Sequence, residues 1–249
     1  MAPGIAQTVR EIAINNPAAV RVFESFGIDY CCGGKRPLRE ACDRANVPVA
    51  KVLESLADVK AEPISPAEKH WADASFLELI EHIVASHHSY IRQETPRLEI
   101  LLDKVVSKHG NAHPELAAIR ELFSAMAREL FAHMLKEDQV LFPFLQKMEL
   151  AARTGTPPPS ACFASVGAPI ARMLADHDDA GALTARIRDL SGNYIAPAGA
   201  CPSYCGLYHG LQEFERDLHQ HVHLENNILF PRALEMERAL QEKSAFDCH

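Results

Sequence analysis

Positive charge and long apolar runs are both scarce in this sequence. The 249 residues contain 25 Lys and Arg against 33 Asp and Glu, so the formal net charge is −8. This balance argues against a protein that binds nucleic acid through bulk electrostatics. No apolar run approaches the roughly 20 residues that a membrane-spanning helix requires. Residues 1–14 lack a basic segment followed by an apolar core, so we expect no signal peptide and a cytoplasmic protein that does not bind membranes.

Strand-like alternation and a disulfide framework are also missing. From residue 72 onwards, apolar residues recur at steps of three and four, which is typical of helices that face a core. The sequence therefore predicts an all-α fold. The seven cysteines are odd in number, and Cys31 and Cys32 are adjacent. Both features fit reduced thiols better than paired ones.

The chain is predicted to divide where Pro63 and Pro66 interrupt the periodicity. We expect a small helical domain at residues 1–62, a linker at 63–71 and a larger domain at 72–243. Short and medium connections between four long helices imply an antiparallel, up-down-up-down four-helix bundle. The four helices are expected at residues 74–108, 114–150, 165–190 and 203–242.

One unusual pattern, H-x-x-x-E-x-x-x-L-F-P, occurs at His133–Pro143 and again 88 residues later at His221–Pro231. Residues four apart lie on the same face of a helix, so each His and Glu offer a nitrogen and a carboxylate to one point. Such donors without thiolate favour iron or manganese over a structural zinc. A solvated helix edge is the alternative reading for either pair alone, but Glu137 and Glu225 both fall within apolar stripes, and the repetition favours a metal.

Two further ligands are expected from the first and third helices. His87 and His88 lie on the edge of one apolar stripe, and periodicity does not choose between them. His177 lies in the stripe of the third helix, and its separation of 89 residues from His88 is close to the 88-residue repeat. We therefore favour His88. The alternative for each residue is a hydrogen-bonded core histidine.

The adjacent cysteines precede Gly33 and Gly34, whose flexible backbone favours a turn. We predict that this turn exposes both thiols, with nearby Lys35 and Arg36 lowering their pKa. The thiols could bind iron in transit, act as a redox pair or dock a partner, and the alternative is two small residues in a turn. Adjacent cysteines rarely bond to each other, so an inter-subunit disulfide and a homodimer stay open. For Cys201 and Cys205 we favour a chance pairing.

Together these motifs resemble the hemerythrin-like di-iron bundle, preceded by the double-cysteine domain of the family that repairs iron–sulfur clusters. The resemblance is carried by D-Y-C-C-G-G-K at residues 29–35 and L-E-N-N-x-L-F-P-R-A at 224–233. It implies that imidazoles bind two irons and that two carboxylates bridge them; these residues are His88, His133, His177, His221, Glu137 and Glu225. It also implies that Glu129 is an acid near the metal, and that Asp176 replaces an expected Glu in a proton or iron path.

The resemblance implies two iron ions joined by an oxo or hydroxo bridge. The ligand count leaves roughly two coordination positions open, which is typical of a reactive site, so NO or O2 could bind there. The expected function is the repair of iron–sulfur clusters damaged by nitrosative or oxidative stress, by supplying iron to damaged proteins or to a cluster scaffold. The alternatives are an NO reductase that forms N2O and a non-catalytic sensor of O2, NO or redox state.

Overall fold

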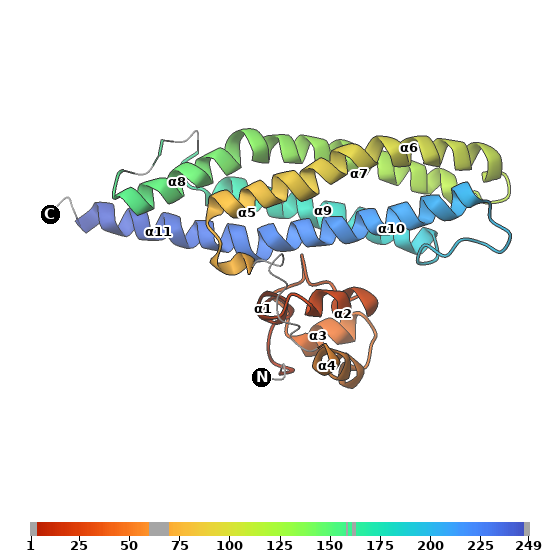
Figure 1. Cartoon of the computed structure of the whole chain (residues 1–249), viewed down its shortest axis with the longest axis horizontal. Coiled ribbons are helices and arrows are strands. Elements are labelled where there is room, and N and C mark those ends of the chain that lie inside the picture. Colours follow the sequence, from red (N-terminus) through yellow and green to blue (C-terminus); the bar gives the residue numbers. More distant parts are fainter. Residues whose placement is uncertain (1–3, 60–69, 158, 161–162, 247–249) are drawn as a thin grey trace. The chain divides into compact units, whose positions relative to one another are not determined.

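A computed structural model describes residues 4–59, 70–157, 159–160 and 163–246. Most of the predicted linker, residues 63–69, lies outside these ranges, as does Cys248. Within them the chain is helical, and pairing of the β type is limited to an isolated bridge between Thr8 and Pro37. The predicted all-α fold, a four-helix bundle preceded by a small helical part, is confirmed (Figure 1). None of the described helices is both long and apolar enough to span a membrane.

The chain forms two compact units. One comprises Met1–Leu79 with His219–Glu235, and the other comprises Ile80–Leu218 with Met236–His249. Residues 219–235 therefore belong with the N-terminal residues by contact, although the sequence pattern assigns them to the bundle. The boundaries predicted at residues 62 and 72 stay a prediction.

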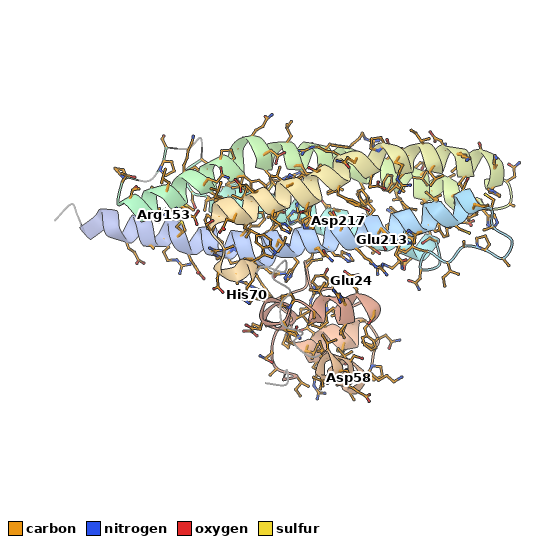
Figure 2. All side chains as sticks on the ribbon, viewed as in Figure 1. Glu24, Asp58, His70, Arg153, Glu213 and Asp217 are labelled. Atoms are coloured by element: carbon orange, nitrogen blue, oxygen red, sulfur yellow. The ribbon has the colours of Figure 1, made fainter. Side chains whose placement is uncertain are left out.

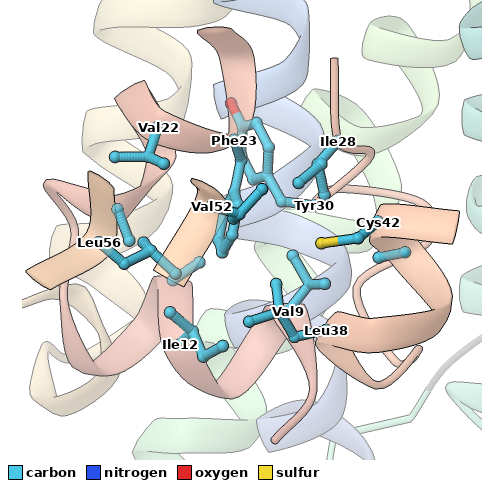
Figure 3. Packing of buried hydrophobic residues seen from close by; sticks show 13 residues of the cluster. Val9, Ile12, Val22, Phe23, Ile28, Tyr30, Leu38, Cys42, Val52 and Leu56 are labelled. Carbon is cyan, nitrogen blue, oxygen red and sulfur yellow. The ribbon is translucent and has the colours of Figure 1, made fainter. Parts of the chain in front are cut away.

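The small domain contains four short helices: α1 (Val9–Asn15), α2 (Ala19–Ser25), α3 (Leu38–Arg44) and α4 (Val49–Asp58). The predicted capping box is present, because Thr8 accepts a hydrogen bond from the Glu11 backbone while the Glu11 carboxylate accepts one from Thr8. Gly27 follows α2 with a φ of 64°, a conformation that favours glycine. The apolar faces enclose a core that includes Phe23 and Tyr30 (Figure 3).

Four helical rods make up the rest of the fold, at nearly the predicted positions. The first joins α5 (Phe76–His82), η2 (Ile83–His88) and α6 (Ser89–His109), after a short helix η1 (Trp71–Asp73). The second joins α7 (Glu115–Lys136), η3 (Glu137–Leu141) and α8 (Phe142–Thr154). The third is α9 (Gly167–Leu190). The fourth joins α10 (Pro202–His223), η4 (Leu224–Leu229) and α11 (Phe230–Phe246).

The segments η2, η3 and η4 are π-helical turns, which the periodicity of the sequence does not predict. In η3 the Phe142 N–H donates to the carbonyl of Glu137, and in η4 the Phe230 N–H donates to the carbonyl of Glu225, five residues back in each case. A proline follows each of these phenylalanines. Proline has no N–H and its ring clashes with the carbonyl four residues earlier, so a wider turn there relieves the conflict. Single π turns in α-helices are frequent at functional sites.

Candidate metal centre

Three rods bring four predicted ligands together within the larger unit. Glu137, at the first position of η3, is fully buried between two imidazoles. The Nε2 atom of His88 lies 3.5 Å from Oε2 of Glu137, and the Nε2 atom of His133 lies 3.2 Å from Oε1. The Nε2 atom of His177, on α9, lies 3.0 Å from Nε2 of His133. The ligand atoms of His133, Glu137 and His177 all lie within 4.8 Å of one another.

Two aspartates hold two of these imidazoles from behind. Nδ1 of His88 donates to Oδ1 of Asp138 at 2.9 Å, and Nδ1 of His133 donates to Oδ2 of Asp176 at 3.3 Å. A carboxylate only accepts, so both rings carry a proton on Nδ1, and each neutral ring keeps a lone pair on Nε2. This is the usual arrangement behind a metal-binding histidine.

The same hydrogen bonds keep both aspartates charged. Partial burial raises the pKa of Asp138, but hydrogen bonds from His88 and Arg92 outweigh it, so the net pKa is below its ordinary value. For Asp176 burial likewise raises the pKa, and the hydrogen bond from His133 with the positive charge of Lys136 and Arg172 lowers it overall. A charged acid behind the ring increases the basicity of the Nε2 atom that faces Glu137.

The donors that face one another fit a cation. With both rings neutral, two Nε2 lone pairs point at a carboxylate that can only accept, so these atoms repel unless positive charge lies between them. The set consists of imidazole and carboxylate without sulfur, which suits iron or manganese. The residues of this unit therefore fit a metal centre of the predicted type.

The second copy of the pattern repeats the first within the smaller unit. Nε2 of His221 lies 3.0 Å from Oε1 of Glu225, and both side chains are fully buried. Glu225 lies in η4 as Glu137 lies in η3. The same sequence therefore builds the same pair of donors on the same kind of turn.

The contacts of His87 and His88 differ. His88 faces Glu137, whereas Nδ1 of His87 lies 2.9 Å from Oδ1 of Asp217 on α10, a residue labelled in Figure 2. Both histidines are buried. Of the two predicted acids, Asp176 contacts His133, while Glu129 is exposed on α7. A role for either acid in a proton or iron path stays a prediction.

The prediction of an exposed, activated cysteine turn is wrong for Cys31. This residue is only 6% exposed. The hydrogen bond with Cys32, burial and the negative charge of Asp29 raise the pKa of Cys31 well above its ordinary value. Arg36 forms an ion pair with Asp29 at 3.6 Å, so the positive charge of Arg36 is compensated by that carboxylate. Cys32 is half-buried, and its sulfur lies 4.0 Å from that of Cys31. A role for either thiol in redox chemistry or iron transfer stays a prediction.

Two residues at the π turns were not identified from the sequence. Asp138 follows Glu137 directly and holds His88. Asn227, in η4, donates to the carbonyl of Tyr30 at 3.0 Å and to that of Cys31 at 3.3 Å. Asn227 also lies 3.0 Å from Nδ1 of His223. An acid or amide one or two positions after a ligand carboxylate is the signal that would have indicated them.

Comparison with known proteins agrees with this geometry. Residues 79–233 match the hemerythrin HHE cation-binding domain, and residues 5–60 match ScdA_N, a domain of unknown function. A probable iron–sulfur cluster repair protein of Haemophilus influenzae is 34% identical, over 92% of this chain and 96% of the relative. The iron–sulfur cluster repair protein YtfE of Musicola paradisiaca is 35% identical over 93% and 97%, and that of Citrobacter koseri 34% identical over 92% and 96%. The chain therefore belongs to the YtfE family of iron–sulfur cluster repair proteins, with a hemerythrin domain that follows a ScdA_N domain.

Proposed function

We propose that this protein repairs iron–sulfur clusters damaged by nitrosative or oxidative stress, and that it does so by supplying iron from a di-iron centre. The names of its relatives support the repair function, and the hemerythrin domain supports the binding of iron. The observation that carries the proposal is the position of Glu137 between the Nε2 atoms of His88 and His133. That arrangement suits a metal cation, and a carboxylate approached from both sides by imidazoles suits a bridge between two metal ions.

The proposed ligand set combines both copies of the pattern. Glu137 and Glu225 would bridge two irons, with an oxo or hydroxo bridge as part of the same proposal. The four imidazoles would complete the set; they belong to His88, His133, His177 and His221. The identical His–Glu spacing and the matching π turns of the two copies support their joint use.

The residues around the proposed ligands fit a role in holding and then releasing iron. Iron held by nitrogen and oxygen donors, without thiolate, is expected to be more readily transferred than iron in a cysteine site. Asp138 and Asp176 fix two of the rings. Asp176 also reaches the half-exposed Lys136 and the exposed Arg172, at 3.4 and 2.8 Å. Asp176 therefore connects a buried ring to the surface charges of the bundle.

The recipients in this proposal are damaged iron–sulfur proteins or a cluster scaffold in the cytoplasm. NO and O2 are the small molecules expected to reach the iron. The homodimer predicted from the cysteine pair belongs to the same proposal, with Cys32 as the thiol concerned, because Cys31 is buried.

The di-iron centre is tested by anaerobic reconstitution with ferrous salt, followed by iron analysis and Mössbauer spectroscopy. We expect about two irons per chain with magnetic coupling between them. The Glu137→Leu/Glu225→Leu protein should bind less than about half as much. Glu121→Leu is the matched control, since Glu121 is exposed on the same helix as His133. A single uncoupled iron in the wild-type protein would contradict the proposal.

The repair function is tested by transfer of isotopically labelled iron to a ferredoxin whose cluster has been destroyed by NO. We expect the label to appear in the rebuilt cluster, in the absence of free iron and after NO has been removed. The double Glu variant should transfer less than about half as much label. Recovery of the cluster without labelled iron would show that the protein acts in another way.

A further inference from the structure

A second cluster of reactive side chains lies at the end of the larger unit, where α6 finishes and α10 begins. His109 is the last residue of α6, and Cys201 directly precedes Pro202, the first residue of α10. Nε2 of His109 lies 3.2 Å from Sγ of Cys201. Because α6 has 21 residues, His109 lies roughly 30 Å along the helix axis from His88. The pair is therefore separate from the metal ligands of this unit.

The partial charges at the ends of α6 and α10 both favour a negative charge on Cys201 and a positive charge on His109. Backbone N–H groups at the start of α10 place positive partial charge beside the Cys201 sulfur, and the carbonyls that end α6 place negative partial charge beside the His109 ring. The carbonyl of Cys201 accepts hydrogen bonds from the N–H groups of Tyr204 and Cys205, so Cys201 stands at the helix start. Transfer of a proton from the sulfur to the imidazole would place each charge at the helix end that stabilises it.

Aromatic packing fixes the position of His109. The ring of Tyr204 is buried, and its centroid lies 5.5 Å from the centroid of His109. The ring of His113 also packs edge-on against Tyr204, with 5.5 Å between the ring centroids, and its Nδ1 lies 3.1 Å from Oε1 of Glu115. His113 thus shares the surroundings of His109 but bonds to a carboxylate and not to a thiol, so it is a suitable control.

Cys205 lies one helical turn after Cys201 and is exposed, whereas Cys201 is half-buried. Its sulfur lies 3.9 Å from the carbonyl oxygen of Ala200, the residue before Cys201, so it extends back over the first turn. Side chains four apart on a helix have Cβ atoms about 5–6 Å apart, and a disulfide needs about 4 Å. A bond between the two cysteines therefore requires the first turn of α10 to move by about 1–2 Å, which would draw Cys201 away from His109.

We propose that Cys201 is a peroxide-reactive thiol, activated by His109 and resolved by Cys205. The Cys201 thiolate attacks a hydroperoxide; an S–O bond forms, the O–O bond breaks, and the imidazolium of His109 protonates the departing oxygen as water or alcohol. The sulfur is oxidised by two electrons to a sulfenic acid while the peroxide is reduced. The Cys205 thiol then attacks this sulfur: an S–S bond forms, the S–O bond breaks, and the thiol proton leaves with the oxygen as water. A cellular dithiol restores both thiols by exchange. This site is independent of the proposed iron centre.

Alkylation of the intact, iron-loaded protein with iodoacetamide at pH 7 tests the activation. Chymotryptic cleavage after Tyr204 separates the two cysteines, so each can be quantified by mass spectrometry. We expect Cys201 to react at least about fivefold faster than Cys205 although it is less exposed. His109→Gln should remove this advantage and His113→Gln should keep it, with the iron content unchanged in both. Equal rates for the two cysteines, or equal behaviour of the two variants, would overturn the proposal.

Oxidation with tert-butyl hydroperoxide tests the resolving step. The wild-type protein should form the Cys201–Cys205 disulfide, and Cys205→Ser should instead give a dimedone adduct on Cys201. Absence of both products would contradict the proposal. If His109→Gln loses its helical signal, the alkylation rates of Cys201 and Cys205 in the wild-type protein decide, and equal rates would refute the proposal.

Discussion

The two copies of H-x-x-x-E-x-x-x-L-F-P agree on their inner face and differ on their outer face. In both, the His and Glu contact each other, at 3.2 Å in the first copy and 3.0 Å in the second, and a π turn follows. On the outer face, Leu135 of the first copy is 52% exposed, while its equivalent in the second copy, His223, is 7% exposed. The next equivalent pair differs in the same way, because Gln139 of the first copy is exposed and Asn227 of the second copy is buried.

The difference arises because the second copy carries the small domain. The Tyr30 ring lies 5.4 Å from that of His223 and 6.2 Å from that of His219, and His219 bonds to Glu24 at 2.9 Å (Glu24 is labelled in Figure 2). A Cβ atom on Gly34 would lie 2.8 Å from the Asn227 side chain, so only glycine fits this close approach. The two copies therefore share their His–Glu face, while the other face of the second copy is a docking surface for the small domain.

The strongest test of the shared inner face is removal of either carboxylate. Glu137→Leu and Glu225→Leu should each reduce bound iron to less than about half of the wild-type amount, because each removes a proposed bridging ligand. Iron analysis after anaerobic reconstitution measures this. If one variant bound iron normally while the other lost it, the two copies would not be equivalent.

A second test concerns Asp138, whose equivalent in the second copy is Asn226. Asp138→Asn should weaken iron binding about 10–100-fold, since a charged acid behind a metal-binding histidine contributes about that much. Competition with a chelator gives the affinity. Asp178→Asn, at an exposed position on α9, is the control. An unchanged affinity for Asp138→Asn would remove the orienting role of this residue.

A third test uses the buried histidine of the outer face. Burial lowers the pKa of His223 to about 4, whereas an unfolded chain titrates near 6.5. The unfolded state therefore takes up the proton first as the pH falls. Stability that depends on neutral His223 is fully present above about pH 6.5 and is lost as the pH falls towards 4, by about 2 kcal/mol between pH 7 and pH 5.

Urea unfolding of the wild-type protein and of His223→Gln at pH 7, 6 and 5 measures this contribution. The variant should lose this part of the pH dependence, and Leu135→Gln, at the exposed equivalent position, should keep it. Parallel pH profiles for the wild-type protein and His223→Gln would show that His223 does not titrate as described.

The last test concerns Asn227, the amide of the docking surface. Asn227→Ala leaves the carbonyls of Tyr30 and Cys31 buried without this donor, so the free energy of unfolding should fall by about 1–3 kcal/mol. Gln139→Ala, its exposed equivalent, should change stability by less than about 0.5 kcal/mol. Denaturant titration compares the two. Similar losses for both variants would mean that helix propensity, not docking, accounts for the effect.

The positions of the rods could be predicted from periodicity, caps and glycine or proline breaks, which are local signals. The capping box of Thr8 and Glu11 is an example, and it was found as predicted. The π turns could not be predicted in this way. A periodicity of 3.6 residues per turn assumes that the apolar residues keep one constant phase along the helix, and a π turn shifts that phase. The turn η2 shifts that phase at His87 and His88, so both are buried, one towards Asp217 and one towards Glu137.

The cysteine turn shows a second reason why local sequence signals can fail. Gly33 and Gly34 do permit a turn, but its direction depends on Tyr30, which is 1% exposed within the core of the small domain. Burial of that ring carries Cys31 inwards. The sequence around the cysteines does not indicate which neighbouring side chain is buried in a core. The exposure of Cys31 was therefore predicted wrongly from the two glycines alone.

The extra residue in each π turn has a consequence for how such chains tolerate insertion and deletion. Removing one residue from η3 would convert it into a regular α turn, because the wider turn already takes up one residue more than an α turn. The buried faces of Phe142 and Leu145 would then keep their direction. The cost of such a deletion is therefore expected at the turn itself, where Glu137 and Asp138 lie, and not in the helix that follows.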